Sequence, residues 1–414
     1  MTLLTTPTTT TTKKAAPRKR TGDLPAVLGG DPVFGERLPL VRPALGDTSA
    51  LERRYADILG SGMLTNGPTV RELEETVAAR LGVAHVVAVA SCTSGLMLVL
   101  QAIGATRHVV LPSLTFSASA HAVMWAGGTP AFAEVSEDSL TLDPTDAERV
   151  VSELGDDVSA MTATHVYGTP CRTQALQQVA DRAGIPLVYD AAHGLGSMRA
   201  GTPVGNFGVA EVFSLSPTKV VVAGEGGLIA THDADLARQL RLGRDYGNPG
   251  DYDTRFAGLN ARMSELHAAT ALHSLSLLDQ ALVRRREMVR LFWAELGEVA
   301  GVRGPILDEG DVSTYKDLTV VVDEATAGVS AAEVGRALAA EGVDSRHYYD
   351  PPIHRQQAYR HLPARSLPLT DRLAGSVVSP ALWSHMDDDQ VRGIARAFRR
   401  ILHHAPAVHE QEIA

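Results

Sequence analysis

The sequence predicts an α/β protein, in which a large domain with a mostly parallel sheet precedes a smaller α+β domain. Between residues 85 and 231, short apolar segments alternate with segments of helical periodicity. Such alternation is typical of βα units, whose strands pair in parallel beneath helices on both faces. Beyond Gly301 the periodic segments become shorter. A chain of 414 residues, 44% of them hydrophobic, is long enough to bury a large core.

The composition argues against several classes of function. The formal net charge of −10 disfavours general binding to nucleic acid. No apolar run approaches the roughly 20 residues that a membrane-spanning helix needs. Cys92 and Cys171 each follow a predicted strand, and two cysteines cannot form a disulfide framework. We therefore expect reduced thiols in a cytoplasmic protein.

The first segment, residues 1–30, is predicted to be a disordered tail. Its first 22 residues hold a run of threonines followed by basic side chains, without the apolar core of a signal peptide. A basic tail can contact anionic partners, although charge runs are usually only solvated. We expect the large domain, with its N-terminal segment, over residues 31–300 and the small domain over residues 301–414.

The elements follow from periodicity and turn residues. Helical periodicity over 48–81 is interrupted by a turn sequence at 64–68. The alternating region predicts strands at 85–90, 109–111, 131–135, 159–166, 186–189 and 228–231. It predicts helices at 96–103, 117–125, 146–154, 174–183 and 236–244. After a polar loop at 245–262 we expect a long helical region at 264–296, a strand at 317–322, a helix at 331–341 and a last helix.

Two tempting motifs have simpler explanations. His385 with the acids at 387–389 resembles a metal site, but acids that open a helix ending in arginines match the helix dipole, so we predict no metal. The glycines at 224–227 do not form a dinucleotide-binding fingerprint after the first strand. A nicotinamide-dependent oxidoreductase, which the alternating pattern alone would allow, is therefore disfavoured.

A hydroxyl-rich turn, Ser91–Gly95, joins the first strand to a helix. Free N–H groups at a helix N-terminus, beside the Thr93 and Ser94 hydroxyls, can hold a phosphate without lysine or arginine. Simple N-capping is the alternative, and it accounts for one hydroxyl rather than three.

Other polar side chains follow further predicted strands. Asp190 and His193 come directly after one strand, and Phe116 follows another. Ligands of open parallel sheets bind beyond the carboxyl ends of the strands, so these residues are candidates for one site. Each also has a structural alternative: Asp190 could cap a helix, His193 could be a satisfied core histidine, and Phe116 could belong to the core.

Lys219 lies in a polar turn, before the apolar residues 220–223 and the glycines at 224–227. Packing of the apolar run would desolvate the amine and lower its pKa, although lysines between strands are usually exposed. A lysine of this kind can form a Schiff base with pyridoxal phosphate (PLP). Asp190 would then keep the pyridine nitrogen protonated, His193 would bind the ring hydroxyl, and Phe116 would stack on the ring.

Seven short motifs together resemble the DegT/StrS family of sugar aminotransferases, over roughly residues 31–402. They are Thr93-Ser94-Gly95, Pro112-Ser113-Leu114-Thr115-Phe116, His165-Val166-Tyr167-Gly168, Asp190-Ala191-Ala192-His193, Ser214 with Lys219, Gly224-Glu225-Gly226-Gly227 and Asn260-Ala261-Arg262-Met263-Ser264-Glu265. The resemblance implies a PLP-dependent transferase of fold type I with a mostly parallel seven-stranded sheet. It also implies a homodimer with shared active sites.

The resemblance assigns roles to individual residues. It implies that Lys219 forms the aldimine and moves the proton, with Asp190, His193 and Phe116 in the roles given above. The remaining positions are implied to bind the phosphate (Thr93, Ser94, Ser214), the phosphate of the neighbouring subunit's cofactor (Asn260) and the substrate (His347, Tyr348, His354).

The expected reaction is transfer of an amino group from L-glutamate or L-glutamine to a keto group of a nucleotide-activated deoxysugar. Residues 112–130, 190–196 and 348–359 are most similar to enzymes that aminate position 4 of a dTDP-4-keto-6-deoxyhexose in antibiotic-sugar pathways. Residues 216–218 and 223–224 differ from those relatives, which leaves 3-keto sugars and ketocyclitols open as acceptors. A PLP-binding regulator without catalysis is the alternative from another class.

Overall fold

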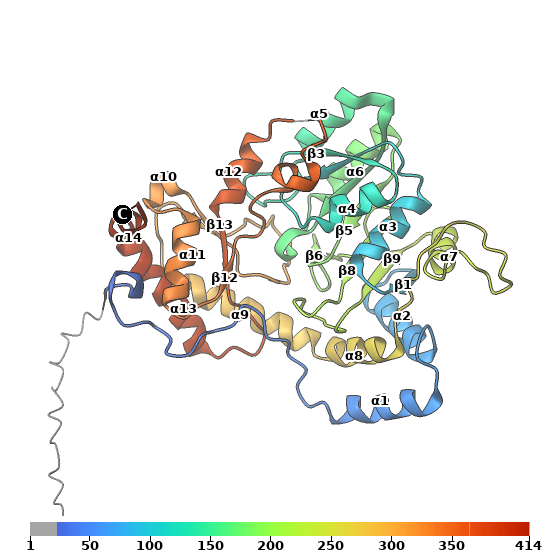
Figure 1. Ribbon diagram of the computed structural model, residues 1–414, viewed down its shortest axis with the longest axis horizontal. Helices are drawn as coiled ribbons and strands as arrows, with labels where there is room; N and C mark the ends of the chain where they lie inside the picture. The colour runs from blue at the N-terminus through green and yellow to red at the C-terminus, as the bar shows by residue number, and fades with distance from the viewer. Residues whose placement is uncertain (1–22, 364, 414) are drawn as a thin grey trace, which may run out of the picture.

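The computed structural model describes residues 23–363 and 365–413 (Figure 1). Within these residues, a seven-stranded sheet has the order β1-β9-β8-β5-β4-β2-β3. The strands are β1 (His85–Val89), β2 (His108–Pro112), β3 (Thr129–Ala133), β4 (Val158–Thr164), β5 (Leu187–Asp190), β8 (Ala210–Ser214) and β9 (Gly227–Thr231). The neighbours from β8 to β3 pair in parallel, whereas β9 is antiparallel to both β1 and β8. The mostly parallel sheet is thus confirmed.

Helices cover both faces of this sheet, because successive strand residues point to opposite sides. Val87 and Val89 pack into the cluster that contains α3, α4 and α7, whereas Val86 and Ala88 pack towards α2 and α8. Further along the second face, α5 and α6 cover β2, β4 and β5. The helices are α2 (Pro68–Leu81), α3 (Cys92–Ala102), α4 (Ala118–Trp125), α5 (Pro144–Leu154), α6 (Thr173–Ala183), α7 (Ala234–Gly243) and α8 (Glu265–Ser276).

A smaller antiparallel sheet follows in the C-terminal part of the described chain, with the order β10-β11-β13-β12. Its core is shared with α9, α11 and α13, and α9 runs from α8 towards this sheet (Figure 1). The elements are α9 (Leu278–Leu296), β10 (Val302–Arg303), β11 (Val320–Val322), α10 (Glu324–Ala327), α11 (Ala331–Ala340), β12 (Ser345–Arg346), α12 (Pro368–Ser376), β13 (Val377–Pro380), α13 (Asp388–His403) and α14 (Ala405–Ile413). The domain limits at residues 300 and 301 stay predictions.

The N-terminal segment reaches both parts of the molecule. Residues 23–30, the end of the predicted tail, include a 3₁₀ helix at Ala26–Leu28, and residues 1–22 lie outside the described chain. Phe34 and Leu38 pack against the core of the small sheet. The segment then crosses to α1 (Ser49–Ser61), which packs against α8 (Figure 1).

A short hairpin and several single-turn helices complete the fold. The strands β6 (Met198–Arg199) and β7 (Thr202–Pro203) form a short hairpin, and single-turn 3₁₀ helices occur at Gly155–Asp157, Val166–Gly168, Ile353–Arg355 and Gln357–Tyr359. Asp387, one of the acids at 387–389, caps α13, because its Oδ1 accepts a hydrogen bond from the Gln390 N–H. Cys92 and Cys171 are buried free thiols. Within the described residues, none of the helices combines the length and apolarity needed to cross a membrane.

Candidate active site

A cavity of about 370 Å³ lies at the carboxyl ends of β4, β5 and β8. Seven of the residues predicted from the sequence line it: Thr93, Phe116, Asp190, His193, Ser214, Lys219 and Tyr348. Their common position follows from the parallel strands, which bring residues far apart in the sequence to one edge of the sheet. The strand-end prediction for Asp190, His193 and Phe116 therefore matches the geometry.

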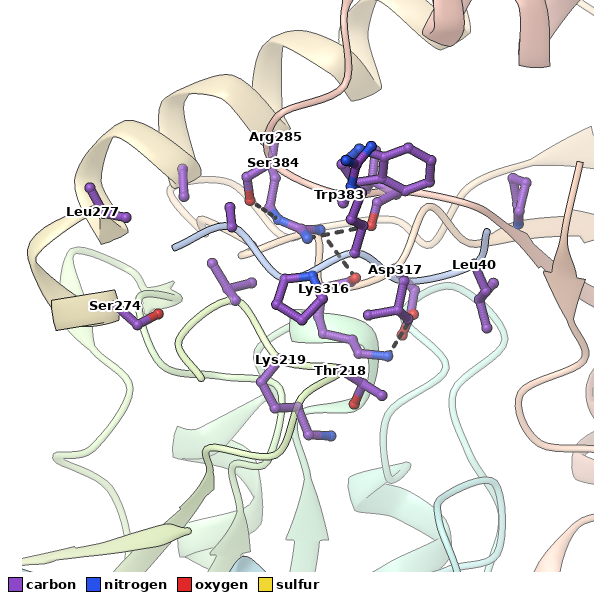
Figure 2. A pocket seen from close by; sticks show the side chains of 18 residues that line it. Leu40, Thr218, Lys219, Ser274, Leu277, Arg285, Lys316, Asp317, Trp383 and Ser384 are labelled. Atoms are coloured by element: carbon purple, nitrogen blue, oxygen red, sulfur yellow. Dashed lines mark hydrogen bonds and ion pairs between the residues drawn. The ribbon is translucent and has the colours of Figure 1, made fainter. Parts of the chain in front are cut away.

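Lys219 lies in the loop between β8 and β9. The loop is closed at its base by the Ala223 N–H, which donates to the Leu215 carbonyl at 2.7 Å, and the Lys219 N–H donates to Ser216. Burial, and then the positive charge of Lys316, lower the pKa of the Lys219 amine to about 8. Figure 2 shows Lys219 below Lys316, and both residues also line a smaller adjoining cavity. The amine can thus lose its proton near neutral pH, as a nucleophile or base must.

Asp190 ends β5 with its carboxylate 3% exposed. The Ser119 hydroxyl donates to Oδ2 at 2.7 Å and the Ala192 N–H donates to Oδ1 at 3.1 Å. These two donors hold the carboxylate in place. A buried carboxylate in a cavity can hold a protonated ring nitrogen of a ligand.

His193 is a neutral hydrogen-bond donor. The Tyr167 N–H donates to its Nδ1 at 3.0 Å, so the ring proton belongs on Nε2. Burial, and then the charges of Lys219 and Lys316, lower the pKa of the imidazole well below its usual value. The Nε2–H group is therefore available to an anionic or phenolic oxygen in the cavity that His193 lines.

The turn before α3 presents backbone N–H groups to the cavity. Ser91 and Ser94 form a reciprocal capping box, in which the Ser94 N–H donates to Ser91 Oγ and the Ser91 N–H donates to Ser94 Oγ. The Ser94 hydroxyl is thus engaged within the turn, whereas Thr93 lines the cavity. Since the first intrahelical bond is made by Gly95, the N–H groups of Cys92 and Thr93 remain available to an anion.

The other predicted residues lie outside this cavity. Asn260 is exposed, and its Oδ1 accepts from Arg262 at 3.3 Å. His347 donates from Nδ1 to the Val377 carbonyl at 2.9 Å. His354 pairs with Ser113 and Asp371 and lines a separate cavity of about 440 Å³ beside Phe132. Their predicted roles stay predictions.

Further lining residues were not predicted from the sequence. Thr164 ends β4, two residues earlier than the predicted strand end, and the strand-end rule applied to the true boundary would have found it. Lys316 and Tyr349 enter the cavity from the C-terminal part of the chain. Ser119 acts from outside the lining, since its hydroxyl donates to Asp190 from α4. Local sequence gave no signal for these three.

The sequence matches the DegT/DnrJ/EryC1/StrS aminotransferase family over residues 47–399. The chain belongs to this family. It is therefore a PLP-dependent aminotransferase, and the sheet is that of fold type I. The family predicted from short motifs and the cofactor predicted from Lys219 are both confirmed.

The similarity to known proteins extends over most of the chain. The structure of DesI in the presence of its TDP-sugar product has a TM-score of 0.89 and 37% identity, covering 95% of this chain and 100% of that one. The erythromycin biosynthesis sensory transduction protein EryC1 of Saccharopolyspora erythraea is 33% identical, covering 82% of this chain and 91% of EryC1. The UDP-N-acetyl-3-dehydro-α-D-glucosamine 3-aminotransferase of Acidithiobacillus ferrooxidans is 31% identical, covering 84% of this chain and 92% of that enzyme.

The residues of the cavity fit PLP. The cavity offers an amine, a carboxylate, a neutral imidazole donor and a helix N-terminus, which are the groups that this cofactor needs. In addition, the buried hydroxyl of Thr164 has no hydrogen-bond partner among the described residues, although it lines the cavity. When bound, PLP supplies an aldehyde for a primary amine and a ring that withdraws electrons from the substrate.

Proposed function

We propose that the protein transfers an amino group from L-glutamate or L-glutamine to a keto group of a nucleotide-activated deoxysugar. The observation that carries the proposal is the grouping of Lys219, Asp190 and His193 in one cavity at the strand ends. The names of two relatives, one bound to a TDP-sugar product and one acting on a UDP-sugar, support a nucleotide sugar as acceptor.

Each residue has a proposed task. Lys219 holds the cofactor and then moves a proton as base and acid, for which its lowered pKa is suited. Asp190 faces the pyridine nitrogen, the His193 Nε2–H binds the ring oxygen, and Phe116 stacks on the ring. The phosphate lies against the N–H groups of Cys92 and Thr93, with Ser214 beside them.

We further propose a homodimer in the cytoplasm. The last turn of α1 and the segment after it expose three apolar side chains close together in the sequence, Leu59 (60%), Met63 (52%) and Leu64 (49%), which a second subunit would cover. Exposed Asn260 would then reach the cofactor phosphate of the partner. Free thiols at Cys92 and Cys171 suit a reducing compartment.

A panel of keto acceptors, each with glutamate or glutamine, tests the reaction and the substrate together. Formation of 2-oxoglutarate or 2-oxoglutaramate, together with the aminated product, should occur with a keto-sugar nucleotide and not with a ketoinositol. Turnover of ketoinositol alone would assign the protein to aminocyclitol synthesis. Absence of turnover with every pair would favour a regulatory role, which the name of EryC1, a sensory transduction protein, makes worth testing.

A further inference from the structure

Lysine is rare in this chain, and its positions are unusual. The sequence contains 33 arginines but only five lysines, at positions 13, 14, 19, 219 and 316. The first three belong to the basic tail. Beyond the tail, arginine supplies every other fixed positive charge, and the two lysines both line the cavity described above and the smaller one beside it (Figure 2).

The Lys316 side chain is held in a defined place. It is 5% exposed, its Nζ lies 2.8 Å from Asp317 Oδ1, and it lies 4.9 Å from the centroid of the Tyr348 ring. An ion pair and a cation–π contact together stabilise a buried ammonium. Lys316 is therefore a fixed charge at the wall of the cavity and not a mobile surface group.

The backbone that carries Lys316 is fixed as well. The Lys316 N–H donates to the Tyr167 carbonyl at 3.1 Å. The buried guanidinium of Arg285 donates to the Lys316 carbonyl (3.2 Å) and to Ser384 Oγ (3.0 Å), as Figure 2 shows. It also donates to the Tyr315 carbonyl at 2.7 Å. The turn is thus tied to α9 on one side and to the loop after β4 on the other.

We propose that Lys316 is a positioning residue of the reaction cavity: its ammonium, held by Asp317 and Tyr348 in the wall that it shares with Lys219, acts through its charge on the Lys219 amine. The proposal rests on the proposed function only in taking Lys219 as the reactive lysine.

Some of the charged groups that face Lys219 raise the pKa of its amine and others lower it. Lys316 lowers the pKa of Lys219, whereas Asp317 and Asp190 raise it. Cys92 also faces Lys219, but burial and Asp190 raise the pKa of its thiol, so it stays uncharged. Lys316 acts on His193 in the same sense as on Lys219, since it lowers the pKa of that imidazole too.

Labelling of the full-length, cofactor-free protein with acetic anhydride tests the proposal without catalysis. Because lysines 219 and 316 lie on different peptides, mass spectrometry can follow the reactivity of each against pH. We expect half-maximal reactivity of Lys219 near pH 8 in the wild-type protein. In Lys316→Met we expect this midpoint to rise by about one pH unit, so that labelling at neutral pH falls roughly tenfold. Lys316→Arg should keep the midpoint near that of the wild-type protein.

Asp317→Asn is the complementary variant. It removes a negative charge that opposes Lys316, so the Lys219 midpoint should fall, opposite to the change in Lys316→Met. This variant keeps the test decisive if Lys316→Met does not fold, as judged by circular dichroism. An unchanged midpoint in both variants would overturn the proposal.

Steady-state kinetics of the holoenzyme separate this role from substrate binding. If Lys316 acts on Lys219, Lys316→Met should lower kcat and shift the acid limb of the kcat–pH profile to higher pH. The KM of the amino donor should change little. A raised donor KM with an unshifted labelling midpoint would show that Lys316 binds the donor carboxylate, and the proposal would be wrong. A shifted midpoint in a protein that turns over no tested substrate would support the proposal and count against the proposed function alone.

Discussion

At the scale of single residues, the cavity shows how the surroundings of a side chain give it a chemical task. His193 could have been a core histidine, but the Tyr167 N–H occupies its Nδ1 and leaves a donor for the cavity. Asp190 could have been a helix cap, and the Ala192 N–H does bind it, yet its carboxylate also lines the cavity. Sequence identified these residues because strand ends are recognisable. It could not identify Lys316, whose partners lie far away in the chain.

Replacing Lys219 with arginine should abolish transamination. Arginine keeps the positive charge, but it cannot bond to the cofactor aldehyde, and it stays protonated at every working pH. We expect turnover to fall by at least about 10²–10⁴-fold, the usual contribution of a catalytic acid or base. Measurement of 2-oxoglutarate formed from glutamate checks this, with the melting temperature as a control for folding. Turnover within tenfold of wild type would contradict the assignment.

His193 should stay neutral across the physiological pH range. Its pKa lies well below the usual value, so protonation occurs only at pH values below the normal histidine range. In NMR spectra of histidine-labelled protein, we expect the imidazole signal of His193 not to titrate between about pH 5.5 and 8. That signal should be absent from His193→Gln. A signal lost in this variant that titrates near pH 6.5 would refute the tautomer argument.

At the scale of elements, the alternating pattern predicted where strands and helices lie and that most strands pair in parallel, but not the direction of β9. The strand at 228–231 was expected, yet its antiparallel direction between β1 and β8 depends on the loop at 215–226 that carries Lys219. The helical region 264–296 is two helices that meet at Leu277, a break without proline or glycine to signal it. The strand β13 follows α12 directly, with no turn residue to separate them.

Gly227 allows β9 to lie close against the turn before α3. A Cβ atom there would lie 2.6 Å from both Cys92 N and Ser91 C, which are backbone atoms that cannot move aside alone. Gly227→Ala should therefore displace the proposed phosphate-binding turn and weaken PLP binding by at least about tenfold, roughly the loss of one hydrogen bond to a charged group. Titration of the cofactor-free protein with PLP measures this.

Gly375→Ala is the matched control for that substitution. Gly375 lies in α12, and a Cβ atom there would have nothing within 4 Å. We expect unchanged cofactor affinity and a gain in stability of up to about 1 kcal/mol, the difference in helix propensity. Equal affinities for both alanine variants would mean that the close approach of Gly227 is unimportant.

At the scale of the whole molecule, the N-terminal segment is bound along the small sheet. Glu341, 0% exposed, accepts hydrogen bonds from the N–H groups of Ala26 and Val33, both at 2.9 Å, and forms an ion pair with Arg400. Arg400 also donates to the carbonyls of Leu24 and Asp31. One buried acid thus connects the start of the described chain to α11 and α13.

Glu341→Ala should destabilise the protein without altering the chemistry. It leaves Arg400 without its carboxylate and two backbone donors without acceptors, a change that typically costs about 3–5 kcal/mol. We expect a lower melting temperature and faster hydrogen exchange in residues 24–38, with kcat preserved in the folded protein. The control is Glu148→Ala, which removes an exposed pair with Arg182 and should cost less than about 1 kcal/mol.

Lys219 and Lys316 line the same cavity but lie on opposite sides of residue 300 in the sequence. Lys219 follows β8, whereas Lys316 precedes β11. A recombinant fragment that ends near that residue would still encode Lys219, Asp190 and His193, but it would lack the second ammonium. The same holds for chimeras in which the C-terminal part is exchanged between relatives. Exchanging the C-terminal part would therefore change the acidity of the Lys219 amine even when Lys219, Asp190 and His193 are all retained.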